Sequence, residues 1–211
     1  YTSIDNPAEY FDIKLWSGTG SEQAISSLGH EPNLVWIKRR DATNNHRLTD
    51  SVRGVTKEIY SDLTDAEDTQ AQGLKSFDST GFTLGTNAGY NASGGTYVGW
   101  CWKESTTAGF DIVSYAGNGV EGRNISHSLG AKPHWMVVKN RSSSVKFAVY
   151  HEKNTSAPGT DHLQLNSDAA TSDDDSTWDD TEPTSSVFRV KSSTSTNGSS
   201  ANYIAYLWTP I

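Results

Sequence analysis

The feature that most constrains the fold is an internal repeat. Segments of the first half return in the second half in the same order: residues 11–13 (FDI) as 110–112 (FDI), 28–32 (LGHEP) as 129–133 (LGAKP), and 96–102 (TYVGWCW) as 202–208 (NYIAYLW). Each half is long enough to bury a core without help from metals or disulfides. The repeat therefore predicts two related domains rather than one large one.

Within each half the apolar residues recur with a period of two, as at Phe11, Ile13 and Leu15. This period is typical of a half-buried strand. Gly- and Ser-rich turn segments such as 17–20 (SGTG) and 92–95 (ASGG) separate the runs. The sequence therefore predicts an all-β protein with two tandem antiparallel β-sandwich domains, jelly-roll or Ig-like, related by internal duplication.

Aromatic residues at matched positions of the two halves are expected to fill equivalent core positions. The matched pairs are Tyr97 with Tyr203, Trp102 with Trp208, and Phe82 with Phe188. The single cysteine, Cys101, cannot form an internal disulfide, and its apolar neighbours indicate a buried small hydrophobic residue.

The expected organisation is an N-terminal arm over residues 1–10, a first domain over 11–104 and a second domain over 105–211. The boundary falls in a polar stretch between the last strand of one repeat and the first strand of the next. The arm has no counterpart in the second half, and it can pack on its own domain or on the sheet edge of a neighbouring copy. Its apolar residues form a candidate self-assembly arm: Tyr1, Ile4 and Tyr10.

Charge and motifs exclude several classes of protein. The formal net charge of −8 repels phosphate backbones, so nucleic acid is not an expected partner. No stretch approaches the roughly 18 apolar residues that a membrane span requires, so membrane insertion is not expected. The sequence contains no nucleophile elbow, His-Glu-x-x-His motif or phosphate loop, so an enzyme is not expected. The weakest alternative is a polysaccharide-cleaving enzyme, which needs two carboxylates in a cleft.

The densest charge cluster is an acidic run in the second half, made of Asp173, Asp174, Asp175, Asp179 and Asp180. Loop carboxylates are ligands that Ca²⁺ prefers, so these residues are the candidate metal site, with a solvated loop as the alternative; no other cofactor is expected. Trp178 lies inside the run. Together with Asp175 and Asp179 it forms a candidate sugar-binding site, unless the ring packs over its own loop.

Five Asn-x-Ser/Thr sequons are candidate glycosylation sites in a secreted protein. They begin at Asn91, Asn124, Asn140, Asn154 and Asn197. Composition alone accounts for about three of them.

Several segments resemble an uncharacterised domain family common in virion structural proteins of marine and freshwater phages. In the first half they are 1–7 (YTSIDNP), 32–38 (PNLVWIK), 50–54 (DSVRG), 76–85 (SFDSTGFTLG) and 97–100 (YVGW). In the second half 148–151 (AVYH) and 183–188 (PTSSVF) resemble the companion repeat. The similarity covers nearly the whole chain, although the connection between the halves is shorter than the family leads us to expect. The resemblance implies a location on the outside of a virion or in an extracellular fibre, and it implies no activity residue by residue.

The expected function is that of a non-enzymatic structural or adhesive subunit of an extracellular assembly, either a phage virion or tail fibre or a self-assembling filament. The expected partners are copies of the same chain, in a homo-oligomer or homopolymer. The alternative is a lectin-like module that binds a host-surface glycan through Trp178 and its acidic neighbours.

Overall fold

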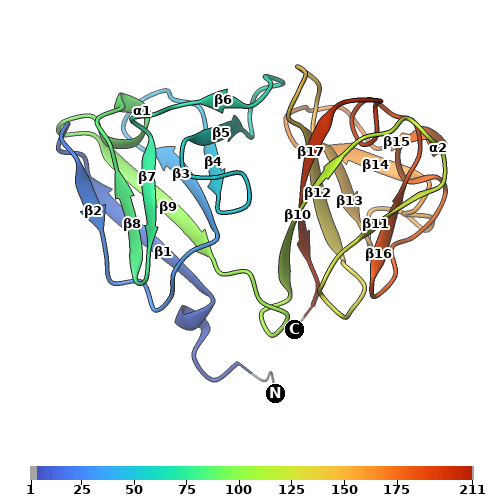
Figure 1. Ribbon diagram of the computed structural model, residues 1–211, viewed down its shortest axis with the longest axis horizontal. Helices are drawn as coiled ribbons and strands as arrows, with labels where there is room; N and C mark the ends of the chain where they lie inside the picture. The colour runs from blue at the N-terminus through green and yellow to red at the C-terminus, as the bar shows by residue number, and fades with distance from the viewer. Residues whose placement is uncertain (1–3, 211) are drawn as a thin grey trace. The chain divides into compact units, whose positions relative to one another are not determined.

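The computed structural model describes residues 4–210, which divide into two compact units (Figure 1). The chain passes from the first unit to the second between Glu104 and Ser105. The short segment Asp62–Ala66 also belongs to the second unit, although the sequence pattern places it in the first domain. Each unit is described by itself below.

The first unit is a two-layer antiparallel β-sandwich. One layer is a six-stranded sheet with the order β1-β9-β3-β4-β5-β6, and the other is a three-stranded sheet with the order β2-β8-β7. The strands are β1 (Phe11–Ser17), β2 (Gln23–Ile25), β3 (Leu34–Arg39), β4 (Arg47–Asp50), β5 (Lys57–Tyr60), β6 (Asp68–Thr69), β7 (Leu74–Asp78), β8 (Gly81–Leu84) and β9 (Thr96–Trp102). Two short helices accompany them, the 3-10 helix η1 (Pro7–Glu9) and α1 (Ala88–Asn91).

The second unit has the same main sheet, with the order β10-β17-β12-β13-β14-β15, and a two-stranded sheet β11-β16. Its strands are β10 (Phe110–Ala116), β11 (Arg123–Ser126), β12 (Trp135–Asn140), β13 (Ala148–His151), β14 (Asp161–Gln164), β15 (Ser172–Asp173), β16 (Val187–Val190) and β17 (Asn202–Trp208). A short helix, α2 (Asp175–Trp178), lies between β15 and β16. The predicted all-β class with antiparallel sheets is confirmed.

The strand registers of the two main sheets correspond position by position. Phe11 pairs with Trp102 in the first unit, and Phe110 pairs with Trp208 in the second. The repeat in the sequence thus marks positions that occupy the same places in their sheets. Descent of both units from one duplicated ancestor stays a prediction from that repeat.

The core of the first unit is built around a stacked aromatic pair. The Trp16 ring lies parallel to the Tyr97 ring at 5.5 Å between centroids, and its edge faces Phe82 at 5.8 Å. Tyr97, Phe82 and Cys101 are fully buried between the two sheets. Burial raises the pKa of the Cys101 thiol to about 12, so the predicted buried cysteine stays protonated.

The core of the second unit repeats this arrangement with different residues. The Tyr115 ring stacks on the Tyr203 ring at 5.1 Å, and its edge faces Phe188 at 6.0 Å. Further along the same core, Tyr150 and Trp178 meet edge to face at 6.3 Å, and both are fully buried. Offset and edge-to-face contacts of this kind add to the stability that burial of the rings already gives.

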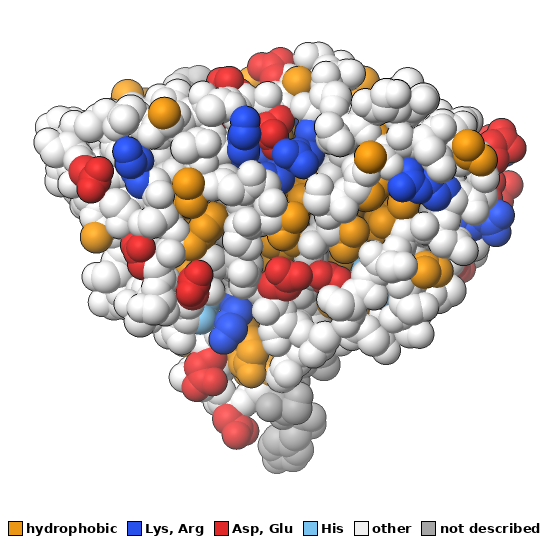
Figure 2. Space-filling view, in the orientation of Figure 1, with side chains coloured by type: hydrophobic (Ala, Val, Ile, Leu, Met, Phe, Trp, Pro, Cys, Tyr) orange, Lys and Arg blue, Asp and Glu red, His pale blue; other side chains and the backbone are white. Residues whose placement is uncertain are grey.

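The face of the molecule drawn in Figure 2 consists largely of uncharged polar side chains and backbone, with hydrophobic, basic and acidic side chains interspersed. Among residues 4–210, no helix has the length and apolar character that crossing a membrane would require.

Candidate functional site

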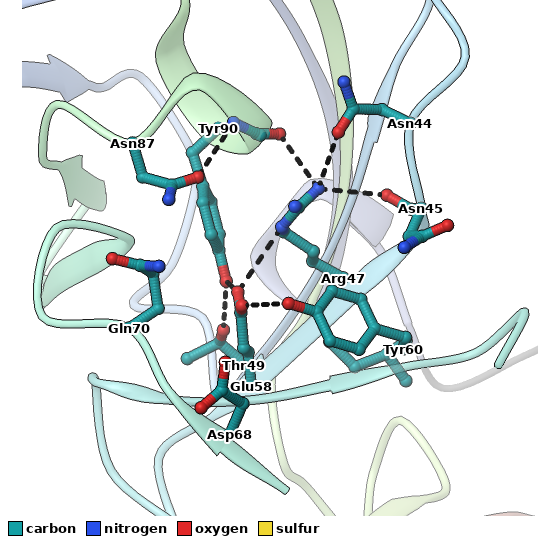
Figure 3. Close-up of polar contacts among 12 residues, drawn as sticks. Asn44, Asn45, Arg47, Thr49, Glu58, Tyr60, Asp68, Gln70, Asn87 and Tyr90 are labelled. Atoms are coloured by element: carbon teal, nitrogen blue, oxygen red, sulfur yellow. Dashed lines mark hydrogen bonds and ion pairs between the residues drawn. The ribbon is translucent and has the colours of Figure 1, made fainter. Parts of the chain in front are cut away.

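The first unit buries a polar cluster around the carboxylate of Glu58 on β5 (Figure 3). The hydroxyls of Tyr60 and Tyr90 each donate a 2.5 Å hydrogen bond to this carboxylate, one to each oxygen. Arg47 Nε on β4 lies 3.4 Å from the oxygen that Tyr90 also contacts. A buried carboxylate is stable only when such partners replace water, and these three partners do so.

The guanidinium of Arg47 connects this cluster to its surroundings. Its Nη1 donates to Asn44 Oδ1 and to the Asn45 carbonyl, at 3.3 and 3.2 Å. Its carbon lies 5.3 Å from the ring centres of both Tyr60 and Tyr90, within range of a cation–π contact.

The pKa shifts in the cluster indicate a structural role. Burial, followed by the hydrogen bond and charge of Glu58, raises the pKa of Tyr60, and burial together with Glu58 also raises the pKa of Tyr90. Both phenols therefore stay protonated as donors. Both carboxylate oxygens of Glu58 are occupied by these phenols, so the cluster has a structural role in the first unit.

A second buried ion pair lies within the segment 50–54 (DSVRG) and accounts for its charged residues. Asp50 Oδ2 lies 2.5 Å from Arg53 Nε, and neither side chain is exposed. The other oxygen of Asp50 accepts the backbone N–H of Arg53, while Arg53 Nη2 donates to the carbonyl of Leu48. The segment is thus a turn closed by its own charged residues.

The main sheet of the first unit carries an aromatic pocket on the face that points away from its core. Three half-buried tryptophans, Trp36 on β3 and Trp100 and Trp102 on β9, line it with the imidazole of His46. The pocket has a volume of about 240 Å³. Trp36 Nε1 donates to His46 Nδ1 at 3.1 Å, so this nitrogen of His46 is an acceptor. The pocket walls are therefore ring faces and edges held in fixed orientations.

Beside the pocket, strand β1 presents a row of exposed apolar side chains. Phe11 is 36% exposed, Ile13 46% and Leu15 63%. Ile13 lies opposite Trp100 in the sheet, and the Phe11 ring lies 5.0 Å from the Trp102 ring. We call this set the outer apolar face: Phe11, Ile13, Leu15, Trp36, Trp100 and Trp102.

The outer apolar face corrects one expectation from the sequence. Tyr97 and Phe82 lie in the core as predicted, but Trp102 lies on the outer face. Its counterpart Trp208 is likewise absent from the core of the second unit, to which Tyr203 belongs. Successive side chains of a strand point to opposite sides, so residues five positions apart, such as Tyr97 and Trp102, cannot share a face. The alternating pattern of β9 contained this information, although nothing in the sequence showed that the outer set would form a pocket.

The structure places Trp178 where it cannot bind a sugar by stacking. Trp178 is 1% exposed and packs in the core of the second unit against Tyr150. The sugar-site interpretation therefore fails at this residue, because no ring face is open to a ligand. Its proposed partners form separate ion pairs, Asp175 with Lys191 and Asp179 with Arg189, each at 2.7 Å.

The acidic run is not assembled into a metal site. Asp174 accepts the backbone N–H of Ser176 and caps α2, and its hydrogen bonds with Ser176 lower its pKa. Asp173 and Asp180 are exposed, and Asp180 adopts a left-handed backbone conformation with φ 47°. Within residues 4–210, no group of three or more His, Cys, Asp or Glu side chains is placed to hold a metal ion. The predicted calcium ligands thus do not converge.

Three of the five sequon asparagines are buried and cannot carry a glycan in the folded protein. Asn91 and Asn197 are 0% exposed and Asn140 is 2% exposed. Asn124 is exposed on β11 and Asn154 is half-buried, so these two remain candidate glycosylation sites. The sequon pattern describes local sequence and contains no information on burial.

Asn91 has a structural role in the first unit. Its Oδ1 accepts the backbone N–H of Thr19 at 2.8 Å, and its Nδ2 donates to the carbonyls of Ser21 and Gly85. The side chain therefore holds the turn after β1 against the segment after β8.

Asn197 has the same role in the second unit. Its Oδ1 accepts the backbone N–H of Asn118 at 3.0 Å, and its Nδ2 donates to the carbonyls of Val120 and Lys191. The two buried asparagines thus make equivalent hydrogen bonds that hold the turn after the first strand of each sandwich.

The described part of the N-terminal arm packs on its own unit. The Tyr10 carbonyl accepts the backbone N–H of Lys103 at 2.8 Å, and the Lys103 ammonium lies 5.8 Å from the Tyr10 ring. The carbonyl of Ala8 lies 2.8 Å from His30 Nδ1. Ile4 is partly exposed, and Tyr1 lies outside the described residues.

Comparison with known proteins gives one kind of match. A model of a family described as a domain of unknown function matches residues 6–211. No curated protein and no solved structure matches the chain. The family match spans both units, so the family model describes the pair as one domain.

Proposed function

The chain belongs to the family described as Domain of unknown function (DUF7483), and we propose that it is a non-enzymatic adhesive subunit whose contact site is the aromatic pocket. The observation that carries this proposal is the convergence of Trp36, Trp100 and Trp102 around one cavity. Rings fixed in this way bind by apolar contact with a ligand surface and need no reacting group.

The ligand class that suits the pocket is a sugar ring. A volume of about 240 Å³ is below the roughly 300–1,000 Å³ of sites for drug-sized molecules, so one ring fits better than a long chain. The C–H face of a sugar stacks on indole rings, and the His46 imidazole adds a polar group to the wall. In this proposal Trp36, Trp100 and Trp102 replace Trp178 as the stacking residues.

The setting we propose is an extracellular assembly such as a phage virion, a tail fibre or a filament. Its support is the resemblance of the sequence to virion structural proteins, together with the largely uncharged polar composition of the surface seen in Figure 2. A glycan-binding subunit in that setting would attach the particle or fibre to a host surface.

The test is a glycan array, with and without calcium, followed by titration of tryptophan fluorescence with any sugar that binds. Replacing Trp102 by Ala is expected to weaken binding roughly tenfold, the effect of losing one stacked ring. Trp208→Ala is the matched control, because Trp208 occupies the same register position in the second unit. The proposal is overturned if the wild-type chain binds no glycan or if both variants lose binding equally.

A second candidate function is that of a structural subunit that contacts copies of itself. The observation that favours it is the exposed apolar row on β1, since large apolar side chains gathered at one surface mark interaction sites.

A further inference from the structure

Strand β1 lies at the edge of its sheet. It is the terminal strand in the order of the six-stranded sheet, and within residues 4–210 it pairs with β9 alone. The backbone groups of even-numbered residues face β9: Tyr10 accepts a hydrogen bond from Lys103, and Gly18 donates one to Gly95. The backbone N–H and C=O groups of Phe11, Ile13 and Leu15 therefore point away from β9, because these directions alternate along a strand. An edge of this kind can accept another strand.

The sequence of this edge is self-complementary. Residues 11–15 read Phe-Asp-Ile-Lys-Leu, so an acidic and a basic residue flank a central apolar one, and apolar residues close both ends. We propose that β1 pairs antiparallel with β1 of a second copy of this chain, centred on Ile13. This homodimer contact goes beyond the pocket function and does not depend on it.

The register follows from the outward backbone groups. In an antiparallel pair, residues that direct both backbone groups at the neighbour lie opposite each other, so Ile13 faces the partner's Ile13. Phe11 then faces the partner's Leu15, and Asp12 faces the partner's Lys14. Opposite charges that face each other across two strands stabilise the pair, whereas like charges destabilise it. A parallel pairing in register would instead set each Asp12 against its copy.

The isolated edge is partly capped by its own side chain. Asp12 Oδ1 accepts the N–H of Ile13 at 2.7 Å, and Asp12 Oδ2 lies 2.9 Å from Lys14 Nζ. In the dimer the carbonyl of the partner's Ile13 takes the place of Asp12 Oδ1. The carboxylate then lies between its own Lys14 and the partner's Lys14.

The matched strand of the second unit supports the specificity of this proposal. Strand β10 is also terminal in its sheet, but it has Val113 and Ser114 at the positions of Lys14 and Leu15. The self-complementary charges therefore belong to β1 alone of these two edge strands.

The experiment is sedimentation velocity over a wide range of protein concentration. The wild-type chain is expected to dimerise, and Asp12→Lys and Lys14→Asp are each expected to weaken dimerisation about tenfold, because each variant places like charges opposite each other twice. Mixing the two variants restores complementary charges and is expected to restore a mixed dimer. Ile13→Lys is expected to abolish the dimer, whereas Val120→Lys, at an exposed apolar residue outside β1, is the matched control.

The outcomes separate this proposal from the others. A wild-type chain that stays monomeric at every concentration overturns the β1 contact and leaves the glycan result unaffected. A dimer that survives both charge variants, or two variants that fail to associate when mixed, also overturns it. Circular dichroism of each variant checks that the fold is retained.

Discussion

The two units fill the same β-sandwich frame in different ways at one end of the core. Arg47 in the first unit lies opposite Ile37 and Tyr60 in its sheet. The corresponding position in the second unit is Ala148, which lies opposite Val138 and Gln164. A buried charge in one unit is thus replaced by a small apolar residue in the other.

The neighbouring positions change together. By the same register, His162 occupies the position of Glu58, and Tyr150 the position of Thr49. The second unit fills this space with the Tyr150 ring, which packs against Trp178. Removing one member of an ion network leaves the others unpaired, whereas neutral side chains can replace the whole network together, as in this pair of units.

The other end of the core has the same arrangement in both units. A stacked aromatic pair and a buried asparagine hold the turn after the first strand in each case. The comparison indicates that the stacked pair and the buried asparagine belong to both sandwiches, while the other end is filled by an ion network in the first unit and by aromatic rings in the second. The predictions below test that division, beginning with the largest expected effect.

Glu58→Ala is expected to destabilise the first unit by about 3–5 kcal/mol, because it leaves the buried charge of Arg47 and the hydroxyls of Tyr60 and Tyr90 without their partner. Chemical denaturation gives the free energy of unfolding. Hydrogen exchange read by mass spectrometry assigns the loss to β4 and β5.

His162→Ala is the matched control in the second unit. His162 is half-buried and contacts Thr177 Oγ1 at 3.4 Å, so its removal leaves no buried charge. We expect a loss of about 1 kcal/mol or less. Equal losses in the two variants would contradict the proposed difference between a charged and a neutral filling.

Asn91→Ala and Asn197→Ala are expected to cost about 1–3 kcal/mol each and to affect their own units equally, because each variant leaves a backbone N–H and two backbone carbonyls without the amide partner. Denaturation of the two variants side by side measures this. If the loss at Asn91 were several times that at Asn197, the shared end would not be equivalent in the two units.

Much of the fold could be predicted because strands leave a period-two pattern and the repeat marks the same positions twice. The all-β class, the antiparallel sheets and the buried Cys101 follow from that pattern. The assignment of Trp102 and Trp208 to the cores was wrong, since matched recurrence does not reveal which side of a strand a residue occupies. Parity along β9, counted from Tyr97, would have separated the two sides.

The candidate site was less predictable because it depends on pairing between distant strands. Trp36 and Trp100 are neighbours through the register of β3 with β9, which no local pattern encodes. The acidic run drew attention to Trp178 by proximity in sequence, although α2 turns that ring into the core. Burial of a sequon such as Asn91 likewise depends on tertiary contacts that a three-residue motif does not contain.

The smallest predicted effect is a dependence on pH that belongs to the second unit. Burial lowers the pKa of His162 below its ordinary value of 6.5, while the charges of Asp174 and Asp161 act in the opposite direction to a lesser degree. Burial lowers the pKa of His127 in the same unit. The unfolded chain therefore binds protons first as the pH falls, and the free energy of unfolding decreases below about pH 6.5.

Denaturation between about pH 7 and about pH 5 measures this dependence in a range above the ordinary pKa values of Asp and Glu. The stability of the second unit is expected to be complete above pH 6.5 and to fall as the pH is lowered toward the depressed pKa of His162. His162→Gln should reduce the slope and leave the contribution of His127. If the slope is the same with and without His162, or if it is confined to the first unit, the neutral filling of the second unit does not depend on an uncharged imidazole.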